Sequence, residues 1–175
     1  VDQLIMRIVD IILAFPSFLL ALVIINSLGP GFMNSIFAVS FSFIAVYARS
    51  TRSLTLSIKE AEYIKHAEAS GSSKMRVMLR HILPNIISPL IVQMAFNMPD
   101  ALLVVASLSF IGLGVQPPTA DWGVMMSQSR TYLEIAPYAA FFPGLAIFVV
   151  AFSFNTIGDV LTDIFDPRRR AGRII

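Results

Sequence analysis

The stretch Glu60-Ala-Glu-Tyr-Ile-Lys-His-Ala-Glu-Ala-Ser-Gly71, followed by residues 72–80 and then by His81-Ile-Leu-Pro-Asn85, decides the fold. It is a charged, helix-forming segment that lies between long apolar stretches. A chain that crosses a bilayer rarely keeps so long a polar insert between its spans unless something outside the membrane binds it. The insert is therefore the first place to look for a function.

The composition predicts a membrane protein. Of the 175 residues, 56% are hydrophobic and only 14% are charged, whereas soluble domains carry about a quarter charged residues. The net charge of +2 is too small to indicate nucleic-acid binding. The absence of cysteine excludes disulfides, thiolate metal sites and iron–sulfur clusters. Because the first residue is Val and no leader-like segment follows, we expect a fragment that lacks its amino-terminal part.

Four apolar stretches are expected to cross the membrane as helices, which predicts an all-α, polytopic bundle. They are residues 8–28, kinked at Pro16; residues 34–48, capped by Asn34; residues 86–113; and residues 138–157. Between them lie the polar insert, residues 50–84, and a loop, residues 114–137. We therefore expect a single transmembrane domain over residues 1–175.

The distribution of basic residues predicts the orientation. With four spans, the basic residues on one side are Arg7, those of the insert with Arg49, and those of the tail, which is Asp166-Pro-Arg-Arg-Arg170 followed by Arg173. That side carries twelve of the thirteen Lys and Arg residues, and only Arg130 falls on the other. We expect a multi-pass protein of the cell inner membrane, with the insert and the carboxyl terminus in the cytoplasm and the loop outside it.

The insert is predicted to form two short helices that meet at Gly71, because Gly suits a helix end and the following Ser72-Ser73 suits a helix cap. On the second helix, an apolar stripe recurs at helical spacing; it consists of Met75, Met78, Leu79 and Ile82. Such a face suits a groove on a partner protein. It equally suits the lipid surface, and amphipathicity alone leaves both open.

The spacing in the insert resembles the signature loop of ABC-type import permeases, the membrane subunits that dock an ATPase. The motif of that family is Glu-Ala-Ala, three residues, Gly, nine residues, Ile, one residue and Leu-Pro. Gly71 and Leu83-Pro84 fall in register, whereas only Ala67 matches the Glu-Ala-Ala and His81 replaces the Ile. The resemblance implies that an ATP-hydrolysing subunit contacts Lys65, His66, Ala67, Gly71, Met75, Met78, Leu83 and Pro84.

Further stretches are similar to the permeases of peptide and nickel importers, in order along nearly the whole chain. They are residues 6–10, 14–16, 80–85, 106–118, 121–123, 143–144, 158–159 and 166–168. Val105 departs from the pattern, since family members usually carry Glu there, and members also have about two more spans upstream. The resemblance implies that the solute is a di- or oligopeptide, with nickel or an oligosaccharide as alternatives. It also implies three partners: cassette ATPase subunits, a second permease subunit in a homo- or heterodimer, and an extracytoplasmic solute-binding protein.

Four polar residues on the third span are candidates for the solute pathway: Gln93, Asn97, Asp100 and Ser107. At about 100° per residue they fall within one arc of roughly 80°. A mid-membrane Asp costs at least ~2.5 kcal/mol on insertion scales, so it must face protein or water. The stripe is interpreted as the pathway lining; the alternative is a seam between packed helices.

Other functions find less support in the sequence. None of the three lysines follows a Gly, so there is no ATP-binding loop, and we expect ATP hydrolysis in a partner and no enzyme activity or cofactor in this chain. An intramembrane enzyme needs a partner for Asp100 at membrane depth, and none is present in the spans. His66 and His81 are not expected to bind metal. An ion-coupled secondary transporter would need broken half-helices in paired repeats and would leave the long insert without a role.

Overall fold

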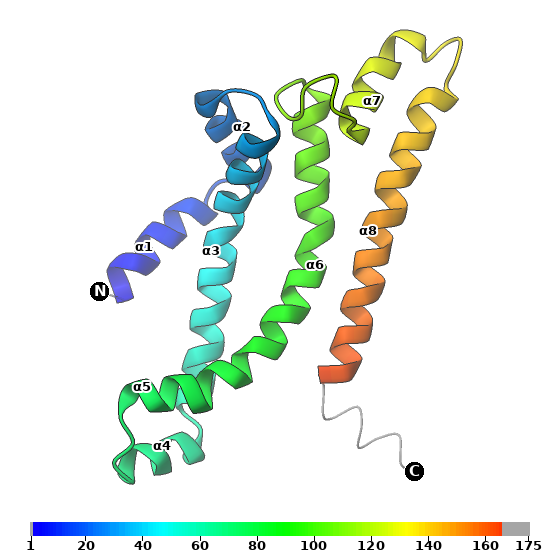
Figure 1. The fold of residues 1–175 in the computed structure, drawn as a ribbon. Helices are drawn as coiled ribbons and strands as arrows, with labels where there is room; N and C mark the ends of the chain where they lie inside the picture. The colour runs from blue at the N-terminus through cyan, green and yellow to red at the C-terminus, as the bar shows by residue number, and fades with distance from the viewer. Residues whose placement is uncertain (1, 166–175) are drawn as a thin grey trace, which may run out of the picture.

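The structure is a computed structural model that describes residues 2–165, and its regular elements are all helical. The elements are α1 (Asp2–Leu13), α2 (Ser17–Leu28), α3 (Phe32–Lys59), α4 (Glu62–Ala69), α5 (Lys74–Val77), η1 (Met78–Ile82), α6 (Leu83–Phe110), α7 (Trp122–Ser129), η2 (Arg130–Tyr132) and α8 (Tyr138–Phe165). The long helices α3, α6 and α8 run from end to end of the molecule (Figure 1). Helices α4 and α5 lie at one end, and α7 lies at the other beside α6 and α8. The predicted all-α bundle is confirmed.

Three helical segments are long and apolar enough to cross a membrane: residues 32–59, 74–110 and 138–165. Helices α1 and α2 add a fourth if the bent pair counts as one span. Each 28-residue helix is about 42 Å long, which exceeds the roughly 30 Å of bilayer hydrocarbon. On α8, Phe141, Phe148 and Phe152 are each more than 60% exposed, which is typical of a surface that faces lipid or a partner rather than water.

Pro16 breaks the first predicted span instead of kinking it. Helix α1 ends at Leu13, and α2 starts at Ser17 at an angle of 91° to it. Proline has no N–H to donate, and its ring pushes the preceding residue into an extended conformation. Pro16 consequently stands outside α2 with extended backbone, and its carbonyl accepts the N–H of Leu20 (3.0 Å).

The second predicted span differs at both ends. Asn34 does not cap α3, which already begins at Phe32. Its side-chain amide instead donates to the carbonyl oxygens of Leu28 and Gly29, both at 3.0 Å, so it closes the end of the preceding helix. At the other end α3 continues past the expected boundary at Ala48 as far as Lys59. The first ten residues of the predicted insert are therefore a continuation of a membrane helix.

The third predicted span is also longer than expected, because no break separates it from the insert. Residues 74–110 run as one helix in which residues 78–82 form a wider π-helical turn. There the N–H of Leu83 reaches back five residues to the carbonyl of Met78. A proline ring clashes with the carbonyl four residues before it in a regular α-helix, and the widened turn lets Pro84 follow without ending the helix. The second short helix of the insert is thus the first part of this long helix.

The predicted loop 114–137 contains helix α7. Asp121 caps it by accepting the N–H of Val124 (2.9 Å). The buried Ser129 donates to the carbonyl of Ala139 (2.9 Å) and so ties the end of α7 to the start of α8. Helix α8 then continues through Gly158 to Phe165, beyond the expected end at residue 157. The basic tail, residues 166–170, lies outside the described residues.

The core lies where α2, α3 and α6 meet. Its buried side chains are Ala21, Ile25, Ala38, Val39, Val104 and Leu108. On the other side of α6, two glycines allow close approach: a Cβ on Gly123 of α7 would lie 2.2 Å from the carbonyl oxygen of Ala106, and one on Gly158 of α8 would lie 2.9 Å from the ring of Phe96. Helix α6 is therefore packed on both sides.

We predict that Gly123→Ala destabilises the packing of α7 on α6, because the added methyl group meets backbone that cannot move aside. Overpacking of this kind costs about 1–3 kcal/mol. Gly144→Ala is the matched control, since its Cβ would meet only the side chain of Met126 at 3.8 Å. The measurement is the thermal unfolding midpoint of the detergent-solubilised protein. Equal midpoints for the two variants would contradict the close contact.

Candidate coupling segment and solute pathway

The predicted turn at Gly71 is present and separates two helices at one end of the molecule. Gly71 has a positive φ of 83°, a conformation that glycine adopts without strain. Two residues later the side chain of Ser73 accepts the N–H of Arg76 and caps α5. The buried side chains of this hairpin are Ile64 in α4 and Val77 in α5, and the ring of Tyr63 contacts that of His81 (6.4 Å between centroids). Neither Ile64 nor Val77 was singled out from the sequence.

The residues predicted to contact an ATPase are mostly exposed at this end. Ala67 is half-buried, and the remaining seven are exposed: Lys65, His66, Gly71, Met75, Met78, Leu83 and Pro84. The apolar stripe is exposed over most of its length, with 62% of Met75 and 52% of Leu79 accessible, while Ile82 is half-buried. An apolar stripe left uncovered next to basic side chains is available for a partner or for a lipid surface.

Two ion pairs hold α1 against α3 on the same side of the molecule as the insert. The guanidinium of Arg52 donates to both carboxylate oxygens of Asp2 (2.8 and 2.9 Å), and Arg49 pairs with Asp10. All four side chains are well exposed, so each pair adds little stability by itself. The two ion pairs orient the amphipathic helix α1 relative to α3, and they contribute little to the stability of the core.

The polar stripe on α6 divides into two parts. Asp100 and Ser107 line an open groove of about 410 Å³ together with Ser17 and Phe18 at the start of α2. Gln93 and Asn97 lie nearer the insert and are half-buried. The amide nitrogen of Asn97 is buried and finds no hydrogen-bond partner among the described residues.

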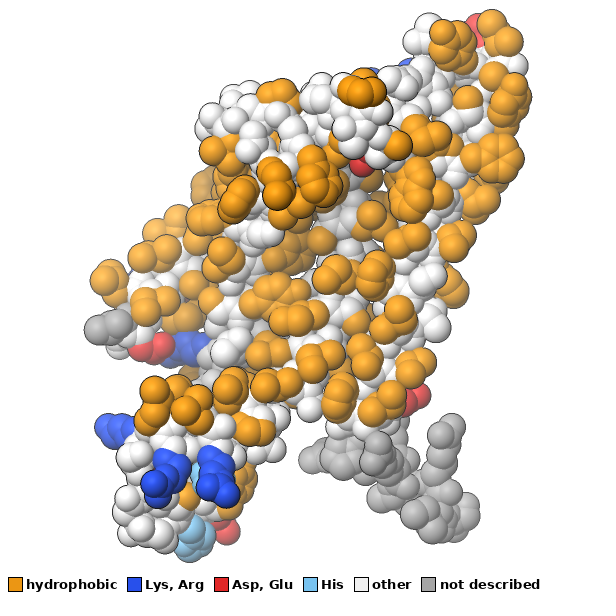
Figure 2. Space-filling model, viewed as in Figure 1, with side chains coloured by type: hydrophobic (Ala, Val, Ile, Leu, Met, Phe, Trp, Pro, Cys, Tyr) orange, Lys and Arg blue, Asp and Glu red, His pale blue; other side chains and the backbone are white. Residues whose placement is uncertain are grey.

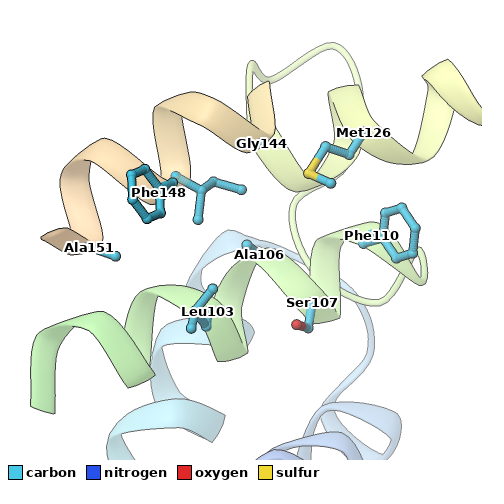
Figure 3. A pocket seen from close by; sticks show the side chains of 9 residues that line it. Leu103, Ala106, Ser107, Phe110, Met126, Gly144, Phe148 and Ala151 are labelled. Carbon is cyan, nitrogen blue, oxygen red and sulfur yellow. The ribbon is translucent and has the colours of Figure 1, made fainter. Parts of the chain in front are cut away.

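A second groove, of about 380 Å³, lies on the adjoining face of α6 and shares Leu103 and Ser107 with the first. It is walled by α6, α7 and α8, and its side chains are almost all apolar (Figure 3). Phe148 and Ala151 of α8 line it at one end, and Met126 and Phe110 at the other. No local pattern in the sequence predicts this groove, because its walls come from three different helices.

Charge is concentrated at the insert end of the molecule. Figure 2 shows apolar side chains over the long helices and basic side chains gathered over α4 and α5. Apolar helices of spanning length that end in a basic hairpin define a multi-pass membrane protein with an extramembrane helical insert.

The particular family follows from comparison with known proteins. Residues 1–171 match the family described as "Binding-protein-dependent transport system inner membrane component". The match covers nearly the whole chain, so the chain belongs to this family, and the resemblance inferred from the motifs is confirmed.

Individual relatives agree. The chain is 43% identical over 171 residues, 98% of its length, to the dipeptide transport system permease protein DppC of Alkalihalophilus pseudofirmus, of which it covers 56%. It is 44% identical over 167 residues, 95% of its length, to the glutathione transport system permease protein GsiD of Escherichia coli O157:H7, of which it covers 55%. The chain thus spans about half the length of these relatives.

We predict that cysteines introduced singly at Asp100 and Ser107 of this Cys-free chain react with a small water-soluble thiol reagent, because both residues line an open groove. Leu108→Cys is the control: it is adjacent in sequence but fully buried. The measurement is the labelling rate in the assembled membrane complex, with and without solute. If the groove belongs to the solute pathway, solute slows the labelling of the cysteines at positions 100 and 107. If neither cysteine reacts, with or without ATP, water does not reach the groove and the prediction is wrong.

Proposed function

We propose that this chain is the transmembrane subunit of an ATP-driven importer of small peptides. The observation that carries the proposal is the family match, in order, along residues 1–171. The relatives support peptides as the solute, because one is named for dipeptides and another for glutathione, itself a small peptide. Nickel and oligosaccharides, the alternatives from the sequence, find no support in these names. Membership of a binding-protein-dependent family likewise favours an ATP-driven importer over an ion-coupled secondary transporter.

In this proposal the exposed hairpin of α4 and α5 docks a partner ATPase in the cytoplasm. Closure of two ATPase subunits displaces the hairpin, and the continuous helix from Lys74 to Phe110 carries the displacement to the grooves on α6. ATP binding supplies energy as a difference in partner affinity between the inward- and outward-open conformations. The chain needs no cofactor of its own, since the energy enters through the partner.

The remaining partners follow from the same proposal. A second permease subunit covers the exposed apolar helix faces and completes the pathway, and a solute-binding protein delivers the peptide on the side of α7. Residues 1–175 act as one permease domain, in which residues 50–84 are the coupling insert and residues 114–137 face away from the cytoplasm. Basic side chains gather over α4 and α5, and this supports the orientation because basic loops are usually on the cytoplasmic side of the membrane.

We predict that vesicles containing the assembled complex, with binding protein, take up a labelled dipeptide only when ATP is supplied on the insert side. Gly71→Val should hydrolyse ATP without uptake, because a β-branched residue is strained at a φ of 83° and distorts the docking turn. Nothing lies within 4 Å of a Cβ at this position, so the effect arises from the backbone and not from a clash.

Gly71→Asn is the matched control, since Asn tolerates a positive φ better than other side chains and should retain most of the uptake. Uptake driven by an ion gradient in the absence of ATP would refute the ATP-driven importer. Normal uptake by Gly71→Val would instead refute the docking role of the hairpin.

A further inference from the structure

Arg130 stacks on the end of α6. The guanidinium carbon lies 3.8 Å from the centroid of the Phe110 ring, where Phe110 is the last residue of α6 and Arg130 the first residue of η2. A guanidinium stacked on a ring uses its face and keeps its N–H donors, which lie in its plane, available for an acceptor. The contact therefore holds the cation at the end of α6 without satisfying its hydrogen bonds.

Arg130 is exposed and forms no ion pair with the described residues, not even with Glu134 four positions further along the chain. Among the described residues, the ion pairs within 4 Å join Asp10 to Arg49 and Asp2 to Arg52, and none involves Arg130. Asp121, the acidic residue before α7, is already engaged in capping that helix. Arg130 is also the single Lys or Arg in residues 81–167, so no other basic side chain in that stretch competes for an anion.

Phe110 connects this cation to the apolar groove of α6, α7 and α8. Its side chain lines the end of the groove beside Met126, whereas Phe148 and Ala151 line the far end (Figure 3). A volume of about 380 Å³ falls in the range of roughly 300–1,000 Å³ that is usual for small-molecule sites. Arg130 does not itself line the groove but lies against the Phe110 ring at its end. An apolar groove with a guanidinium beside its end is complementary to a small molecule with an apolar side chain and a carboxylate.

We propose that Arg130 receives the carboxylate of the solute and that the groove takes its apolar side chain, so that Arg130 determines specificity for peptides with a free carboxyl terminus. The inference rests on the proposed peptide importer and deepens it. An anionic lipid presents similar chemistry through its phosphate. The solute carboxylate is the occupant proposed here because of where the groove lies. It shares Leu103 and Ser107 with the groove that contains Asp100. Asp100 and Ser107 are the residues assigned to the solute pathway.

The test compares ATP-driven uptake of Ala-Phe and of its carboxyl-terminal amide by the assembled complex in vesicles. Arg130→Gln should raise the KM for Ala-Phe about tenfold, the usual worth of a charge-assisted hydrogen bond, and should leave uptake of the amide unchanged. Arg130→Lys keeps the charge and should retain part of the preference for the free acid. Phe148→Ala should weaken uptake of Ala-Phe while sparing Ala-Gly, since only the larger side chain fills the groove.

A purely structural role for the stack predicts that Arg130→Gln and Arg130→Lys lower uptake of acid and amide equally, and this result would overturn the proposal. A lipid site predicts that uptake of both solutes depends on anionic lipid and that Arg130→Gln removes this dependence, which would overturn it as well. Both results presuppose ATP-driven dipeptide uptake by the unmodified complex. The absence of that uptake would refute the proposed function itself.

Discussion

The structure depends on the continuity of one helix. From Lys74 to Phe110 the backbone runs unbroken for about 55 Å, and its two ends carry the two regions of interest. At one end the exposed Met75 belongs to the proposed docking hairpin; at the other, Phe110 closes the apolar groove beneath Arg130. The helix bends from the direction of α5 into that of α6 (Figure 1), but it has no break, so it transmits a displacement that a loop would absorb. The widened turn before Pro84 keeps the helix continuous there, and the helix also continues through Pro89 and Pro99.

The packing around α6 determines what moves with it. The buried cluster with α2 and α3 holds one side, and close backbone approach at Gly123 and Gly158 holds α7 and α8 on the other. Because both grooves share α6 residues, a shift of this helix changes both together. Apolar side chains elsewhere on α8 remain uncovered, which leaves surface for lipid and for the proposed second permease subunit.

The sequence predicts those features that depend on neighbouring residues, and it does not predict those that depend on contacts between distant segments. Apolar stretches, the turn at Gly71 and the family motifs are readable because each depends on neighbouring residues. Proline is ambiguous in sequence: Pro16 lies at a break between two helices, whereas Pro84, Pro89 and Pro99 lie within one continuous helix. The Asp121 cap could have revealed α7. The apolar groove is walled by three helices and Arg130 reaches the end of α6 from η2, so no spacing in the sequence indicates either.

The most direct test of the account changes the stiffness of the long helix at its widened turn. One variant replaces Arg80, His81 and Ile82 with glycine, and its control replaces the same residues with alanine, so both lose the same side chains. Each glycine weakens a helix by about 1 kcal/mol relative to alanine. The measurement is the number of peptides taken up per ATP hydrolysed by the assembled complex. The account predicts near-normal coupling for the alanine variant and loss of most uptake, with continued ATP hydrolysis, for the glycine variant; equal coupling in both would contradict it.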